Sequence, residues 1–160
     1  MKKAIMILAA ALLLASCSGA TGGTSPAPAE EFFFRAPGAG IEVRINDDMS
    51  EALAALGEPL KYFEAASCAF TGLDKTYTYS GFVITTRPEG ERDLICSIRL
   101  TDDSAATPEG VYIGCGAARV KAAYPSSSAT DNVVRAEKGG TALNIIMKDG
   151  AVISIEYLPA

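Results

Sequence analysis

The chain contains no histidine, and this absence excludes several kinds of active site. Without an imidazole there is no Ser-His-Asp triad and no Cys-His nucleophile, and the commonest metal ligand is missing. The sequence also has no Cys-x-x-Cys pair and no glycine-rich phosphate loop before a helix. The paired carboxylates at 47–48 and 102–103 lack the spacing of a calcium loop. We therefore predict a protein that is not an enzyme and uses no metal.

Basic residues are scarce and unclustered. The chain has 14 Lys and Arg against 19 Asp and Glu, a net charge of −5. Loss of an N-terminal signal containing Lys2 and Lys3 leaves 12 against 19, a net charge of −7. An acidic chain without a basic patch is a poor ligand for nucleic acid or for anionic lipid. We predict no nucleic-acid partner. Any contact with a membrane must come from something other than basic side chains.

The apolar run near the N-terminus is too short to be a permanent membrane span. It covers Ala4 to Leu14, about ten residues, whereas a spanning helix needs about 20. It follows the two lysines and ends in Leu14-Ala15-Ser16-Cys17, which resembles a bacterial lipobox. We predict a signal peptide over 1–16 and a diacylglycerol on Cys17, with palmitate-type chains that anchor the protein to the membrane. The expected location is the outer face of the cell membrane, or the outer membrane where a cell has one.

Three further cysteines follow Cys17, namely Cys68, Cys96 and Cys115. An odd number leaves at least one free thiol or an intermolecular pair, and the pairing stays open. Cys115 falls at a predicted helix start, a position that favours a thiolate, and Cys68 falls in a predicted loop. Both are candidate reactive thiols, although a tolerated small residue is the simpler interpretation of Cys115.

Residues 17–39 are rich in Gly, Ser, Thr, Pro and Ala, which is typical of a flexible tether. The triplet Phe32-Phe33-Phe34 interrupts it. One interpretation is that the triplet docks on the folded part as an edge segment, and the other is that it forms a partner site.

The folded part is predicted as two α+β repeats, 40–103 and 104–160. Val111 and Ile113 match Val43 and Ile45 at an offset of 68. In each half a short strand precedes a short helix, predicted over 49–56 with Asp48 as N-cap and near 120–124. Period-two patterns predict strands at 76–79, 82–86, 96–100, 132–136, 141–147 and 151–157, and a loop over 60–75. The predicted class is α+β: a tandem repeat of a short helix packed on an antiparallel three- to four-stranded meander, with the two sheets joined.

The last hairpin has a predicted register. A three-residue loop over 148–150 sets Ile145 opposite Ile153, with apolar residues paired throughout and Gly150 at positive φ. The same alignment places Cys96 where Ile153 sits, so Cys96 is expected to be a small core residue.

Two features carry a resemblance to known families. The helix ending Leu56-Gly57-Glu58-Pro59, followed by strands ending in Ser-Ile segments, resembles the tandem module of β-lactamase-inhibitor proteins and the single module of assembly lipoproteins of the SmpA/OmlA kind. The segment 64–79 is similar to part of uncharacterised surface lipoproteins of anaerobic Gram-positive bacteria. These resemblances imply a non-catalytic module whose open sheet face or loops bind another protein. Gly114-Cys115-Gly116 departs from the pattern, which puts the start of the second helix in doubt.

Aromatic residues cluster in the first half and are the candidate partner-binding residues, with core packing as the alternative. They are Tyr62, Phe63, Phe70, Tyr77 and Tyr79. The leading hypothesis is a lipid-anchored, extracytoplasmic, non-catalytic binding or scaffold protein that recognises an envelope or secreted protein. One alternative is an inhibitor of a secreted or envelope enzyme. Another is a thiol-dependent enzyme or redox sensor that uses Cys115 or Cys68. The partner's identity and the oligomeric state stay open.

Overall fold

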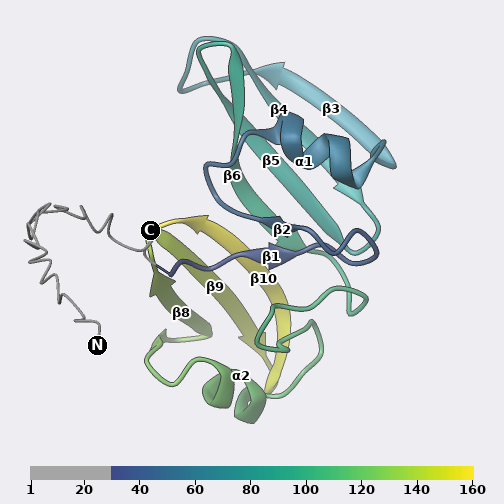
Figure 1. Ribbon diagram of the computed structural model, residues 1–160. Helices are drawn as coiled ribbons and strands as arrows, with labels where there is room; N and C mark the ends of the chain where they lie inside the picture. The colour runs from purple at the N-terminus through teal and green to yellow at the C-terminus, as the bar shows by residue number, and fades with distance from the viewer. Residues whose placement is uncertain (1–29) are drawn as a thin grey trace, which may run out of the picture.

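A computed structural model describes residues 30–160; the predicted signal peptide, Cys17 and the tether up to residue 29 lie outside the described residues. One antiparallel eight-stranded sheet dominates, with the strand order β3-β4-β5-β6-β10-β9-β8-β7 (Figure 1). A two-stranded sheet and two short helices accompany it. The elements are β1 (Phe34–Arg35), β2 (Glu42–Val43), α1 (Met49–Leu56), β3 (Lys61–Ala66), β4 (Leu73–Tyr79), β5 (Phe82–Glu89), β6 (Arg92–Leu100), α2 (Ala117–Ala123), β7 (Ser128–Thr130), β8 (Val133–Lys138), β9 (Thr141–Lys148) and β10 (Ala151–Pro159).

The predicted fold class is wrong. Strand accounts for 49% of the structure and helix for 11%, so the protein is mostly β rather than a repeated helix-on-meander α+β fold. The strands of both predicted halves, β3 to β10, belong to one sheet, because β6 pairs directly with β10 through Ile98–Tyr157 and Leu100–Ile155. Helices of eight and seven residues are too short to cover this sheet, and irregular segments complete the second layer.

The error has an identifiable source in the segment 60–75, which was expected to be a loop. It holds β3 and the start of β4, paired from Lys61–Thr78 to Ala66–Leu73. Every residue of β3 is exposed, on both faces. An edge strand of this kind has no buried face, so it leaves no period-two pattern for a sequence argument to detect. β7, also exposed throughout, was missed for the same reason.

The predicted register of the last hairpin is also wrong, although Gly150 does have positive φ (81°). The loop is the two-residue Asp149-Gly150, and both residues have positive φ, as in a type I′ turn. A bulge at Ile153 then shifts the register, so that Ile145 faces Ile155 and Ile153 is half exposed. The extra residue returns the apolar side chains to the buried face, which a two-residue loop without a bulge would not do.

Cys96 occupies the matching bulge in the β5–β6 hairpin, between the Thr85–Ser97 and Thr86–Ile95 pairs. It is not the core residue that was expected. It is partly buried, and its thiol donates to the Thr85 carbonyl at 3.3 Å. This partial burial raises the pKa of the Cys96 thiol.

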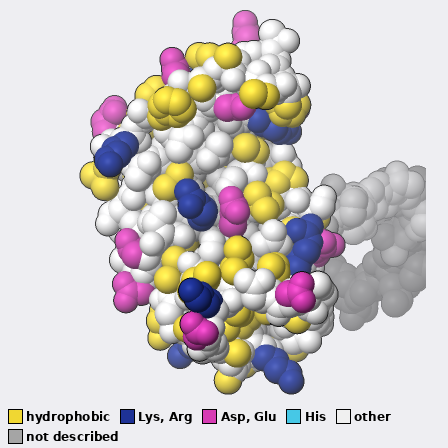
Figure 2. Space-filling model, turned by 180° about the vertical axis from the view of Figure 1, so that it is seen from behind, with side chains coloured by type: hydrophobic (Ala, Val, Ile, Leu, Met, Phe, Trp, Pro, Cys, Tyr) yellow, Lys and Arg dark blue, Asp and Glu magenta, His cyan; other side chains and the backbone are white. Residues whose placement is uncertain are grey.

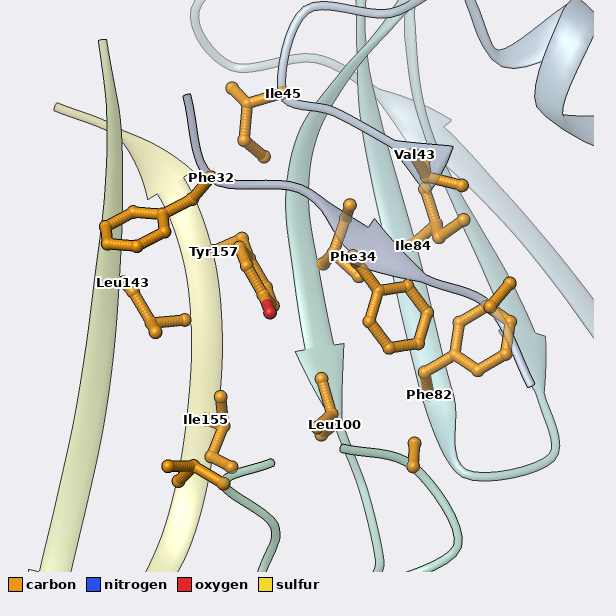
Figure 3. Packing of buried hydrophobic residues seen from close by; sticks show 14 of the residues in the cluster. Phe32, Phe34, Val43, Ile45, Phe82, Ile84, Leu100, Leu143, Ile155 and Tyr157 are labelled. Atoms are coloured by element: carbon orange, nitrogen blue, oxygen red, sulfur yellow. The ribbon is translucent and has the colours of Figure 1, made fainter. Parts of the chain in front are cut away.

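One face of the sheet is covered by the helices, the β1–β2 hairpin and the connection 101–110 (Figure 1). We call residues 30–36 the strap. Phe34 of the strap is fully buried, with its ring 4.9 Å from Phe82 and 6.2 Å from Tyr157 (Figure 3). Phe32 is 9% exposed and packs edge-on against Tyr124. The end of the predicted tether is therefore part of the core, laid across the sheet rather than along its edge.

The other face carries no helix, and Figure 2 shows it as a mixture of apolar and charged side chains without one continuous apolar area. Its residues alternate with the core residues along each strand. Charged and polar groups pair across it, as in Ser97 to Glu156 at 2.6 Å and Arg135 to Asn144 at 3.0 Å. Opposite-charge and polar pairs of this type stabilise a solvent-facing sheet surface.

Candidate functional site

Exposed large hydrophobic side chains gather at one place in the described chain. Of seven such residues, five lie between positions 60 and 73, which we call the β3 hairpin. They are Leu60 (72% exposed), Tyr62 (50%), Phe63 (65%), Phe70 (48%) and Leu73 (39%). Exposed apolar groups that cluster instead of scattering mark an interaction site in a soluble domain.

β3 is the last strand of the sheet on its side, so its outer edge has no strand neighbour among the described residues. The Ser67 N–H donates to the Gly72 carbonyl at 3.0 Å, and bonded pairs alternate along an antiparallel ladder. Lys61, Phe63 and Ala65 therefore bond to β4. The N–H and C=O groups of Tyr62, Glu64 and Ala66 point to the open edge.

The two aromatic side chains of β3 lie on opposite faces. Tyr62 is opposite Tyr77 and on the covered face, with ring centroids 5.2 Å apart. The Tyr62 hydroxyl donates to the Glu64 carboxylate, and this bond raises the pKa of Tyr62. Phe63 is opposite Thr76 on the bare face. The hairpin thus offers apolar surface on both sides of the sheet edge.

The loop from 67 to 72 has a defined shape. The Ser67 hydroxyl accepts hydrogen bonds from the N–H groups of Ala69 and Phe70. Gly72 has φ of 131°, and a Cβ there would lie 2.7 Å from the Pro88 side chain, so glycine is required for this approach. The Arg87 guanidinium lies 5.5 Å from the centre of the Phe70 ring, a cation–π arrangement that holds the ring over the bare face.

Next to β3, Lys75 of β4 forms an ion pair of 2.6 Å with Asp93 of β6. Both side chains are about one-quarter exposed. The hydrogen bond to Asp93 raises the pKa of Lys75. Since both groups are satisfied by each other, they tie β4 to β6 and leave neither charge free for chemistry.

The other predicted partner-binding residues are structural. Tyr77 is 6% exposed and Tyr79 is 9% exposed, so both belong to the core. The Tyr79 hydroxyl donates to the Gly57 carbonyl at 3.1 Å and ties β4 to the end of α1. Burial raises the pKa of both phenols. The candidate site therefore keeps Tyr62, Phe63 and Phe70 and loses these two.

Sequence reasoning missed Leu60 and Leu73, which lie at the two ends of the hairpin. The usable signal was the pair of aromatics at 62–63, separated by a serine- and glycine-containing segment from the alternating residues 73–79. Such a pattern is typical of a hairpin.

The described cysteines are all free. Cys68 is exposed in the hairpin loop, whereas Cys115 is only 4% exposed and lies before α2. No base lies in hydrogen-bonding contact with either sulfur in the described part of the chain, and a buried Cys115 is inaccessible to a substrate. Among residues 30–160, no group of three His, Cys, Asp or Glu residues is placed to hold a metal ion.

A hollow of about 350 Å³ lies between α2 and the strands β7 to β9. Val120, Val134 and Met147 contribute apolar lining, and Lys121 contributes a charged group. The hydroxyls of Tyr124 and Ser127 also line the hollow, but Tyr124 already bonds to Thr107 and Glu109, and Ser127 donates to the Tyr124 carbonyl at 2.7 Å. Neither hydroxyl is therefore placed to orient a small ligand. Within residues 30–160, no helix is long and apolar enough to cross a bilayer.

Comparisons with known proteins add no assignment: no protein-family model matches the chain, and no curated protein or solved structure is significantly similar to it. The family resemblances stated from the sequence therefore stay predictions.

Proposed function

We propose that this protein is a lipid-anchored, non-catalytic binding or scaffold protein of the extracytoplasmic surface, and that it contacts a protein partner through the β3 hairpin. The anchor and the location rest on the sequence, namely the short apolar run and the Leu14-Ala15-Ser16-Cys17 segment. The observation that carries the binding role is the concentration of five of the seven exposed large hydrophobic residues at 60–73.

The hairpin has the composition of a protein interface. Tyr and Phe supply large contact areas at small cost in conformational entropy, and an arginine stacked on an aromatic ring is a common interface element. Here the Arg87–Phe70 pair holds the ring in place before any partner arrives. A preorganised ring loses less entropy on binding.

The test is site-specific photo-crosslinking in intact cells. A photoreactive phenylalanine replaces Phe70, and a matched control replaces Tyr112, whose ring also lies under an arginine (Arg119, 5.6 Å) but outside the hairpin. We expect a discrete envelope or secreted protein to be trapped from position 70 and not from position 112. Identical products from both positions, or only lipid and wall material, would contradict the proposal.

A further inference from the structure

The free edge of β3 is complementary to a second copy of itself. This inference concerns the same hairpin and rests on the proposed function, because it assumes that the edge is a binding surface. Unpaired strand N–H and C=O groups are best satisfied by another extended strand. Six exposed residues of β3 provide such an edge, whereas β7 on the other side of the sheet provides only three.

Symmetry restricts the possible pairings. When two identical antiparallel strands lie side by side in one sheet, a two-fold axis runs perpendicular to the sheet, and one residue must face its own copy. A pair centred on Glu64 sets two carboxylates against each other. A pair centred on Tyr62 sets Glu64 against Leu60 of the second copy, whose N–H already donates to the Thr78 carbonyl at 2.8 Å, so the Glu64 carbonyl is left without a donor. The pair centred on Phe63 opposes no carboxylates and pairs Glu64 fully with Tyr62.

In the Phe63-centred pair, the outward-pointing N–H and C=O groups of Tyr62 and Glu64 all find partners, whereas the N–H of Leu60 stays bonded to the Thr78 carbonyl at 2.8 Å. Tyr62 exchanges backbone hydrogen bonds with Glu64 of the second copy, and Leu60 faces Ala66. On the bare face Phe63 meets Phe63 of the second copy, and Lys61 meets Ala65. No like charges are opposed, and the three most exposed hydrophobic side chains of the hairpin, Leu60, Phe63 and Tyr62, all become covered.

We propose that two copies of this protein pair antiparallel through β3, with the axis at Phe63, to form one continuous sixteen-stranded sheet. The pairing covers β3 and leaves the 67–72 loops free, so that each dimer presents two Phe70 loops to a partner. A single strand pair is a small interface. Anchoring both copies in one membrane raises their effective concentration, which allows a small interface to suffice.

Disulfide trapping tests the register directly. Residues facing each other in a non-hydrogen-bonded antiparallel pair have Cα atoms about 4.5 Å apart, within the range of a disulfide. The experiment uses the full chain in isolated cell membranes, with Cys68→Ser to remove the exposed native thiol, and variants that are to be mixed are produced in the same cells. Under mild oxidation Phe63→Cys should form a covalent dimer in high yield.

Two controls define the axis. Lys61→Cys and Ala65→Cys should each stay monomeric alone, and a mixture of these two variants should form the mixed dimer. Glu64→Pro, added to Phe63→Cys, removes an outward-pointing donor without removing a bond to β4, and should strongly reduce the yield. Circular dichroism checks that the proline variant keeps its sheet.

The proposal fails if Phe63→Cys is trapped no faster than Lys61→Cys, or if the Lys61→Cys and Ala65→Cys mixture gives no mixed dimer. These outcomes are independent of the photo-crosslinking result. An envelope protein trapped at position 70 without any Phe63 disulfide keeps the proposed function and removes the dimer. A Phe63 disulfide without a trapped envelope protein keeps the dimer and removes the proposed function.

Discussion

The two sides of the sheet, β3–β6 and β7–β10, are alike at the centre and different at the outer edges. Near the centre the Asn46 N–H donates to the Ile95 carbonyl at 2.8 Å, and the Gly114 N–H donates to the Val152 carbonyl at 2.7 Å. Each side also has a bulge two residues before a fully buried isoleucine, Ile98 or Ile155. At the edges, β3 has six residues and β7 has three.

This difference in length indicates which edge of the sheet can accept a further strand. A short edge strand offers too few backbone groups to template another strand, which is one of the ways in which proteins prevent association. The β7 edge is protected in this way. The β3 edge is twice as long and carries exposed aromatics, so an interaction surface is expected on that side alone.

The largest expected effect comes from the strap, which bridges the two sides. Phe34→Ala removes a fully buried ring that lies against Phe82 of β5 and Tyr157 of β10. We expect a loss of about 3–5 kcal/mol in the free energy of unfolding, measured by urea denaturation. Phe33→Ala is the matched control: that ring lies outside the core beside Arg35 and Arg44, and its loss should cost less than about 1 kcal/mol. Equal losses would show that the strap does not join the sides.

A smaller effect is expected at the turn that receives the strap. A Cβ on Gly139 would lie 2.4 Å from the Cβ of Glu31, whereas a Cβ on Gly140 would meet nothing within 4 Å. Both glycines have positive φ, so alanine at either position carries a backbone cost of about 1–2 kcal/mol. Gly139→Ala should cost about 1–3 kcal/mol more, because the strap must move. Thermal unfolding of the two variants measures the difference, and equal melting temperatures would argue against the packed strap.

The smallest effect concerns the helix caps, where the two sides again differ. Asp48 caps α1 by accepting from the Ser50 N–H at 2.9 Å, whereas Gly116 before α2 provides no side-chain cap. Asp48→Ala should lower the melting temperature, and Gly116→Ser should raise stability by a few tenths of a kcal/mol. Scanning calorimetry is sensitive enough to compare the two. A destabilising Gly116→Ser would show that the second helix start is constrained by something other than its cap.

The Asp48 cap also predicts a pH dependence. Hydrogen bonds from Ser50 lower the pKa of Asp48 below 3.8. A lowered folded-state pKa gives a stabilisation that is complete above the unfolded-state value and is lost as the pH falls through the folded-state value. The difference between wild type and Asp48→Ala should therefore be constant from pH 5 to 7 and shrink in acid below about pH 4. A difference that persists in acid would assign the effect to helix propensity.

Sequence reasoning succeeded where a residue has one buried face or a special backbone conformation. Asp48, Gly57 and the α1 stripe were placed correctly because capping and helical spacing are local. It failed at β3, where both faces are exposed, and at Ile153, where a bulge changes the register by one residue. Both failures concern the pairing of neighbouring strands in a hairpin, which the alternation of buried and exposed residues does not determine when both faces are exposed or when a bulge intervenes.

The candidate site was found in part for the same reason. Composition pointed to Tyr62, Phe63 and Phe70, but it could not separate them from Tyr77 and Tyr79. Strand position distinguishes the two groups. Tyr77 and Tyr79 belong to β4, which has a neighbouring strand on each side, and both are buried on the covered face. The triplet 32–34 shows the converse, since the surrounding composition suggested a tether while the alternating rings fill the core.

The ion pair between Glu30 and Lys138, 3.0 Å long, fixes the place where the described chain joins the sheet. That place is β8, beside the C-terminus of the protein (Figure 1). Six inter-strand steps separate β8 from β3, and at about 4.8 Å for each step this is a span of roughly 30 Å. With the anchor that we propose upstream of Glu30, a sheet lying parallel to the bilayer would keep its β8 margin beside its own anchor and hold its β3 margin out to the side, where a neighbouring anchored copy can reach it.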